Sequence, residues 1–320
     1  MFKYFGVNLD EDKRKRMKAV QSFLGLLNDL ARLPFEHHLV FGCRSSTRVK
    51  ALTLLTLALQ TDSMTPAQAS KIRGVVTWLD TGLYGRPCRG LLGTFTARQY
   101  WEESTNWQLT SSLKLACLAL QSMVQDMPDR MVNTFRRLEP PLIMYTDAAA
   151  QDRSIRLGLL LMKPHVPALC FSIDVPAAVV DAWAFRTQYI GQGELLAGPL
   201  ALHVFQHELL GKSLIWFIDN QASLTAMLKG SSPVQDNSAM ALIAAMQIAR
   251  YRVSCWFEFV DSKANPSDPL SRGGYEDPDV SSQLARGTWQ KIRPRRFSWT
   301  HLIRSDVIRL KLQVSALGGL

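Results

Sequence analysis

The periodicity of apolar and polar positions changes near residue 139 and divides the chain into two regions. Before this point apolar residues recur with the spacing of amphipathic helices, most clearly in Arg48 to Gln60 and in Ser111 to Asp126. Between these stretches Thr65 precedes Pro66, and Gln68 stands at the third helical position, which is the pattern of a capped helix start. The region up to about Arg137 is therefore predicted to be mainly helical.

After a proline-containing linker at residues 136–141, short apolar runs take over. The runs LIMYTD, IRLGLLLM and ALCFSID are separated by polar turns, which predicts a meander of three strands. A long helical stretch follows from Gly191 to Leu210, although Pro199 is expected to kink or divide it. Beyond it, SLIWFID and VSCWFEFV predict two more strands, with the helices NQASLTAMLKG and NSAMALIAAMQIARYR between them. This order predicts an α/β domain with a mixed five-stranded sheet flanked by helices.

The net charge of the chain bears on the kind of partner that it binds. The chain has 320 residues, and its 37 Lys and Arg against 27 Asp and Glu give a net charge of +10. Such an excess favours a polyanionic partner, but a basic enzyme of small molecules fits the charge equally well. From Arg286 to Leu320 eight bases face one acid, Asp306. This basic tail is expected either to contact nucleic acid or to be a solvated helix face.

Cysteine usage and hydropathy restrict the compartment. The five cysteines are scattered and form no CxxC pair, so neither a disulfide framework nor a structural zinc site is indicated. The most apolar windows are about ten residues long, well short of the roughly 20 that cross a bilayer. We therefore expect an intracellular, reducing compartment, without distinguishing nucleus from cytoplasm, and no membrane insertion.

Four carboxylates stand where the predicted sheet could bring them together. Asp147 and Asp219 end two strands, Glu194 lies in the first turns of the long helix, and Asp268 follows the last strand. Acids held this close repel one another unless a cation neutralises them. Oxygen ligands without imidazole or thiolate select Mg²⁺ or Mn²⁺, and two such ions about 4 Å apart support phosphodiester hydrolysis.

Each acid also has a plainer interpretation as a turn, cap or helix-dipole residue, so the hypothesis depends on their order along the chain. Six polar residues near the acids are candidates for binding nucleic acid: Asn220, Gln221, Ser223, Lys263, Asn265 and Arg272. Asn220 could instead be only a helix cap.

Four motifs resemble the ribonuclease H domain that follows the reverse transcriptase in retroelements, particularly the DIRS-like and BEL/Pao-like types. They are YTDAA, GELLAGPLAL, FIDNQASLTAML and FVDSKANPSDPLSRG, within residues 140–274. The resemblance implies an endonuclease that hydrolyses the RNA strand of RNA·DNA hybrids. It also implies that Asp147, Glu194, Asp219 and Asp268 hold two Mg²⁺ ions, for which Mn²⁺ can substitute.

The preceding region is similar to the end of a reverse transcriptase. Ser22 to Leu30 resembles a primer-grip hairpin, and the helices after it resemble a thumb and connection. The resemblance implies four segments: palm and primer grip at 1–62, thumb and connection at 63–138, ribonuclease H at 139–275 and a basic tail at 276–320. No Tyr-x-Asp-Asp motif occurs in the chain, so polymerisation is expected only from an upstream part of the same polyprotein.

Two departures keep other functions open. No His precedes the last carboxylate, and the first motif lacks the serine usual in the family. A catalytically inactive nucleic-acid-binding remnant is therefore an alternative. An integrase-like or resolvase-like nuclease, which would use three acids on DNA, is another, although the closing NPSDPLSR speaks against it.

Overall fold

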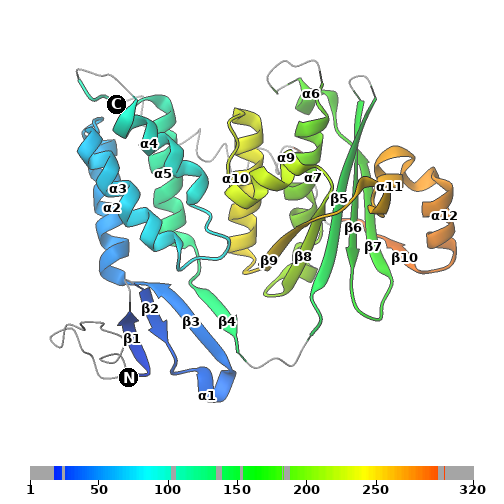
Figure 1. Ribbon diagram of the computed structural model, residues 1–320, viewed down its shortest axis with the longest axis horizontal. Coiled ribbons are helices and arrows are strands. Elements are labelled where there is room, and N and C mark those ends of the chain that lie inside the picture. The colour runs from blue at the N-terminus through cyan, green and yellow to red at the C-terminus, as the bar shows by residue number, and fades with distance from the viewer. Residues whose placement is uncertain are drawn as a thin grey trace, which may run out of the picture.

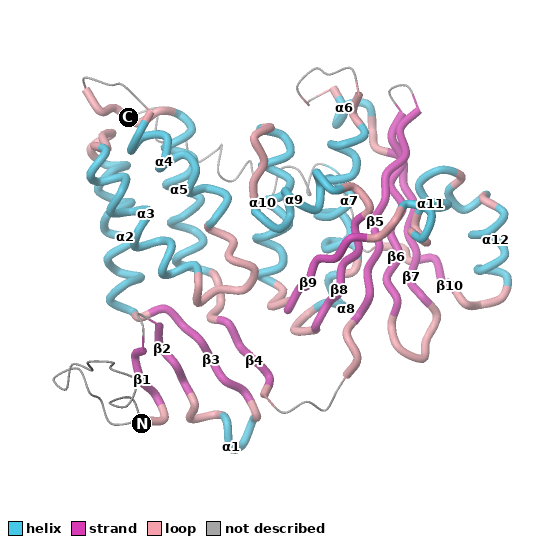
Figure 2. Tube along the Cα trace, viewed as in Figure 1, coloured by secondary structure: helices cyan, strands magenta, loops and turns pink. Residues whose placement is uncertain are grey.

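A computed structural model of the chain describes residues 18–23, 26–101, 106–134, 139–151, 154–181, 183, 188–294 and 299. The expected linker falls partly outside these residues, as does most of the basic tail. Figure 1 shows a helical unit and a larger α/β unit side by side, and Figure 2 shows the two separate sheets. None of the described helices is both long enough and apolar enough to cross a membrane.

The first unit combines four main helices with a small antiparallel sheet. The sheet order is β1-β2-β3-β4, formed by Val20–Phe23, Leu26–Asp29, His38–Cys43 and Arg130–Asn133. The short helix α1 (Leu33–Glu36) joins β2 to β3. The longer helices stand on this sheet, as Figure 1 shows, and are α2 (Ser45–Gln60), α3 (Pro66–Asp80), α4 (Leu92–Tyr100) and α5 (Ser111–Asp126), with the turn η3 (Arg89–Leu91) before α4.

Local signals predicted the helices of this unit well. The Thr65 side chain accepts from the Gln68 N–H, and the Gln68 side chain accepts in return, so the expected capping box is confirmed. The description of this region as mainly helical was incomplete, because β3 and β4 pair across 86 intervening residues. The pair of β1 and β2 overlaps the predicted Ser22 to Leu30 segment, while its primer-grip role stays a prediction.

The second unit is built on a six-stranded mixed sheet of order β10-β7-β6-β5-β8-β9. The strand β6 is antiparallel to both its neighbours, whereas β5, β8 and β9 run parallel, as do β7 and β10. The six strands are β5 (Leu142–Gln151), β6 (Ser154–Met162), β7 (Ala168–Asp174), β8 (Ser213–Ile218), β9 (Ser254–Phe259) and β10 (Trp289–Lys291). Five were predicted. The sixth, β10, comes from the segment that we expected to be a basic tail, so the five-strand count was wrong.

Helices cover both faces of this sheet. One face packs against α7 (Ile190–Val204), α9 (Gln221–Lys229) and α10 (Gln235–Arg250), while α11 (Asp268–Arg272) and α12 (Pro278–Ala285) cover the other. The remaining short elements are α6 (Ala177–Val180), α8 (Gln206–Leu209), η4 (Ser262–Ala264) and η5 (Gly274–Glu276). Pro199 lies inside α7 without dividing it. This mixed α/β architecture is compatible with a ribonuclease H-like fold.

The helix α10 belongs to two hydrophobic cores. Met240 and Ala244 pack in the core under the six-stranded sheet, whereas Met246 and Ala249 pack among the helices of the first unit. Figure 1 shows α10 between the two units. The site described next therefore sits on a sheet that is supported from both units.

Candidate active site

Three of the predicted carboxylates meet at one edge of the sheet. Thr146 of β5 pairs with Ile218 of the parallel strand β8, so the next residues, Asp147 and Asp219, lie side by side. Glu194 comes from the second turn of α7. One oxygen from each of Asp147, Glu194 and Asp219 lies within 4.8 Å of the other two.

Close packing of α7 brings Glu194 to this edge. At Gly193 an added Cβ would lie 2.9 Å from the Ile155 side chain and 3.1 Å from that of Ala148. The missing side chain therefore lets the helix approach β5 and β6 at the residue before the glutamate. Glu194 also accepts a hydrogen bond from the Ala148 backbone N–H.

The three carboxylates are short of partners. Asp147 and Glu194 are only 4% and 8% exposed, and Asp219 is half-buried. Among the described residues, Glu194 Oε2 and Asp219 Oδ1 are buried without a hydrogen-bond partner. Buried carboxylate oxygens in this position are costly unless a cation or a proton compensates them.

Burial and mutual repulsion set the protonation of the cluster. Burial, more than any other cause, raises the pKa of Asp147, and the Asp219 charge raises it further, while the Ser271 hydroxyl opposes both. Burial likewise raises the pKa of Glu194, followed by the charges of Asp147 and Asp219. Without a cation the cluster therefore retains protons toward neutral pH. An oxygen-only set with unsatisfied buried atoms fits a hard divalent ion such as Mg²⁺.

Asn265 and Ser271 fix the segment after β9 against the edge of the sheet that carries the carboxylates. The Asn265 amide donates to the Thr146 carbonyl (3.4 Å), and its oxygen accepts from the Ser267 hydroxyl (2.7 Å) and N–H (3.1 Å). The Ser271 hydroxyl donates to the Asp147 carboxylate and is also 2.8 Å from the Asp268 carbonyl oxygen. The closing motif thus supports Asp147, although it contributes no carboxylate to the group of Asp147, Glu194 and Asp219.

Gly158 makes this arrangement possible. It pairs directly with Asp147 across β5 and β6. A Cβ at this position would stand 2.5 Å from the Ser267 carbonyl oxygen and 2.6 Å from the Ser271 nitrogen. Only glycine lets α11 rest this closely on the sheet, which brings Ser271 within reach of Asp147.

Asp268 is near the cluster but not in it. Both of its carboxylate oxygens lie 2.8 Å from Nε of Arg272, one helical turn later. Its charge contributes to the raised pKa of both Asp147 and Glu194, so it lies close enough to act on them electrostatically. Within the described part of the chain, the group of carboxylates close enough to hold one metal ion contains three of the four predicted acids. A ligand role for Asp268 stays a prediction.

The predicted nucleic-acid-binding residues fall into two classes. Asn220 caps α9, because its side-chain oxygen accepts from the Ser223 N–H at 3.0 Å. Ser223 and Asn265 are 2% and 3% exposed, so their side chains are enclosed by the protein, and the nucleic-acid contact of these two residues stays a prediction. The side chains of Gln221, Lys263 and Arg272 are exposed and remain candidates.

No protein-family model matches the chain, and no curated protein matches it. Part of the chain is similar to the solved structure of RNase H1 from the halophilic archaeon Halobacterium salinarum NRC-1. It is 14% identical with a TM-score of 0.33 and covers 43% of this chain and 99% of that chain. A similarity of this size supplies no argument about function, which must come from the site itself.

Proposed function

We propose that the chain is a metal-dependent endonuclease that hydrolyses the RNA strand of RNA·DNA hybrids. The observation that supports this most directly is the buried group of three carboxylates with two unpartnered oxygens. The strand order of the sheet and the net charge of +10 agree with such a function. The four motifs of the ribonuclease H resemblance specify the hybrid as substrate.

Each residue has a definite task in this proposal. Asp147, Glu194 and Asp219 would hold Mg²⁺, with Asp268 joining them if its pair with Arg272 opens. When bound, Mg²⁺ supplies Lewis-acid activation of a water and charge neutralisation at the phosphate. Ser271 fixes the rotamer of Asp147 by hydrogen bonding. Gln221, at the start of α9, and Lys263 would position the phosphate backbone.

The wider setting is also part of the proposal. The motifs resemble those of a retroelement polyprotein, so we infer an upstream polymerase portion as the partner of this chain. The intracellular, reducing compartment rests on cysteine usage. The residue ranges assigned to thumb, connection and tail rest on the same resemblance.

Cleavage of end-labelled duplexes tests this function. The full chain is incubated with RNA·DNA, RNA·RNA and DNA·DNA duplexes in Mg²⁺, Mn²⁺ or EDTA. Asp219→Asn should abolish cutting of the hybrid, whereas Asp279→Asn, an isosteric change on the exposed surface of α12, should leave it intact. Cutting of DNA·DNA alone would instead favour the integrase-like alternative.

A second candidate is a catalytically inactive nucleic-acid-binding module. The observation in its favour is the ion pair that holds Asp268 on Arg272, outside the group of three acids. Under this alternative the chain binds the hybrid in the presence of Mg²⁺ or Mn²⁺, and the hybrid remains intact. Cleavage of the hybrid by the wild type therefore separates the two candidates. If the wild type cuts, Asp268→Asn reduces cleavage only if Asp268 takes part in the site.

A further inference from the structure

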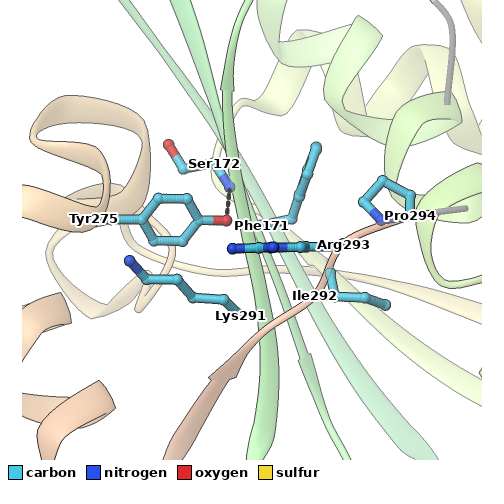
Figure 3. A pocket seen from close by; sticks show the side chains of 7 residues that line it. All are labelled: Phe171, Ser172, Tyr275, Lys291, Ile292, Arg293 and Pro294. Atoms are coloured by element: carbon cyan, nitrogen blue, oxygen red, sulfur yellow. Dashed lines mark hydrogen bonds between the residues drawn. The ribbon is translucent and has the colours of Figure 1, made fainter.

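A basic notch lies where β10 joins the sheet. Beyond β10 the chain continues along β7, because the Ile292 N–H donates to the Cys170 carbonyl at 3.1 Å. The cavity there has a volume of about 490 Å³ and is open to solvent. Phe171, Ile292 and Pro294 form its apolar wall, and its polar lining consists of Ser172, Tyr275, Lys291 and Arg293, as Figure 3 shows.

The notch carries two positive charges and no acid. Lys291 and Arg293 are exposed, and neither pairs with a carboxylate among the described residues. Figure 3 shows both side chains extending toward Tyr275, and Lys291 Nζ lies 4.2 Å from the centre of its ring. Asp174, two residues beyond Ser172 on β7, is already bound by Arg156, whose Nε lies 2.7 Å from Oδ1.

Tyr275 adds a neutral donor. Its hydroxyl oxygen accepts from the Ser172 N–H at 3.1 Å, and its own hydrogen has no acceptor within the described part of the chain. An ammonium, a guanidinium and a phenol hydroxyl thus converge on one small cavity. This set of donors suits one oxyanion that has several acceptor oxygens, such as a phosphodiester.

The notch shares a sheet face with Asp147, one of the three carboxylates. Asp147 pairs with Gly158, and Gly158 pairs with Ser172, so these residues form one row across three strands. The helix α11 contacts both ends of this row. The Ser271 hydroxyl donates to Asp147, and the Ser172 hydroxyl donates to the Leu270 carbonyl. At about 4.8 Å per strand, the strand β10 lies roughly 14 Å from Asp147.

We propose that this notch binds a backbone phosphate of the nucleic acid that is cut at the three carboxylates. A separation of roughly 14 Å corresponds to about four nucleotides at 3.4 Å per nucleotide along a duplex. Lys291 and Arg293 would fix the register of the duplex on this face without reading its sequence. The inference rests on the proposed function, because it assigns the substrate strand to this side of the site.

Binding of a labelled hybrid by the full chain in EDTA tests the notch, with KCl varied. The double variant Lys291→Ala/Arg293→Ala should bind about tenfold more weakly, and the slope of log K against log salt should become smaller by about 1 to 2. The control Lys50→Ala/Lys229→Ala removes the same charge from α2 and α9 and should retain the wild-type slope. Lys291→Arg/Arg293→Lys preserves both charges and should also bind as the wild type.

Trimmed hybrids locate the contact. When a hybrid ends about two nucleotides from the scissile bond on the side of the notch, wild type and the double alanine variant should bind it equally. The proposed phosphate site would be overturned if the double alanine variant bound long hybrids with the affinity and salt slope of the wild type. It would also be overturned if the control variant lost as much affinity as the double alanine variant. If the wild type cuts no hybrid, the proposed function fails, whereas the salt slopes still decide whether this surface binds nucleic acid.

Discussion

Ser271 connects the closing motif to β5, the strand that carries Asp147, through a single hydroxyl. It is 1% exposed and donates to Asp147, and this hydrogen bond opposes the burial and the Asp219 charge that raise the pKa of Asp147. Asn265 has a comparable task, since it fixes Thr146, the residue before Asp147. At this scale the closing motif supports the carboxylates, and its buried residues Asn265 and Ser271 stabilise the fold through these hydrogen bonds.

Removing this hydroxyl tests its role as a positioning group. Ser271→Ala should destabilise the fold by about 1 to 3 kcal/mol and reduce hybrid cleavage, because the buried Asp147 loses the hydrogen bond that favours its charged form. The pH at which activity reaches half its maximum should rise. Urea unfolding and a pH–rate profile measure the two effects, with the exposed Ser262→Ala as control. Unchanged pH dependence would show that Ser271 only fills space.

The raised pKa values predict how stability depends on pH. The pKa of Asp147 rises from 3.8 to about 7, so between these values the unfolded chain releases a proton that the folded chain keeps. The metal-free protein should therefore lose stability as pH rises from about 4 to 7, and the raised pKa of Glu194 extends the loss to higher pH. Asp147→Asn should flatten the dependence. Thermal melts across pH measure it, and adding Mg²⁺ near pH 8 should raise the melting temperature.

At the scale of elements, the site depends on how closely two helices approach the sheet. The helix α7 rests on β5 and β6 at Gly193, and α11 rests on β6 at Gly158. Both contacts have too little room for a Cβ. The position of Ser271 is therefore set by backbone-to-backbone packing.

Substitution of Gly158 should displace α11. Gly158→Ala places a methyl group against backbone atoms that cannot move independently, so a loss of about 3 kcal/mol or more and loss of cleavage are expected. Gly191→Ala, in α7 with no atom within 4 Å of the added carbon, should be neutral or stabilise by up to about 1 kcal/mol. Chemical denaturation of both variants makes the comparison. Equal stability of the two would contradict tight packing at Gly158.

At the scale of the whole molecule, α10 joins the two units. Besides its two cores, a close backbone contact links them, since a Cβ at Gly90 would lie 2.0 Å from the Gly230 carbonyl oxygen. The first unit thereby supports the sheet that carries the carboxylates.

This shared helix predicts one unfolding transition. Met246→Ala removes side-chain volume from the core of the first unit and should cost about 2 to 5 kcal/mol. The transition should move as a whole, with circular dichroism and tryptophan fluorescence coinciding. Two separated transitions would show that the units fold independently.

The local sequence determined most of the elements and three parts of the site. A helix cap or the end of a strand depends on neighbours within a few residues, so the capping box at Thr65 and the end of β8 just before Asp219 could be predicted. The expectation that Asp147 also ends its strand was wrong, because β5 continues along β6 to Gln151, and Asp147 meets Asp219 through the pairing of β5 with β8. Glu194 joined them because α7 crosses the sheet as its apolar pattern required.

Tertiary structure alone decided the remainder. The pairing of β4 with β3, the addition of β10 and the ion pair that holds Asp268 on Arg272 depend on where distant segments pack. The burial of Ser223 and Asn265 depends on the same packing. Periodicity reports contacts within a helix or strand, whereas long-range pairing depends on which surfaces the folded chain brings together, and a single sequence does not display those surfaces.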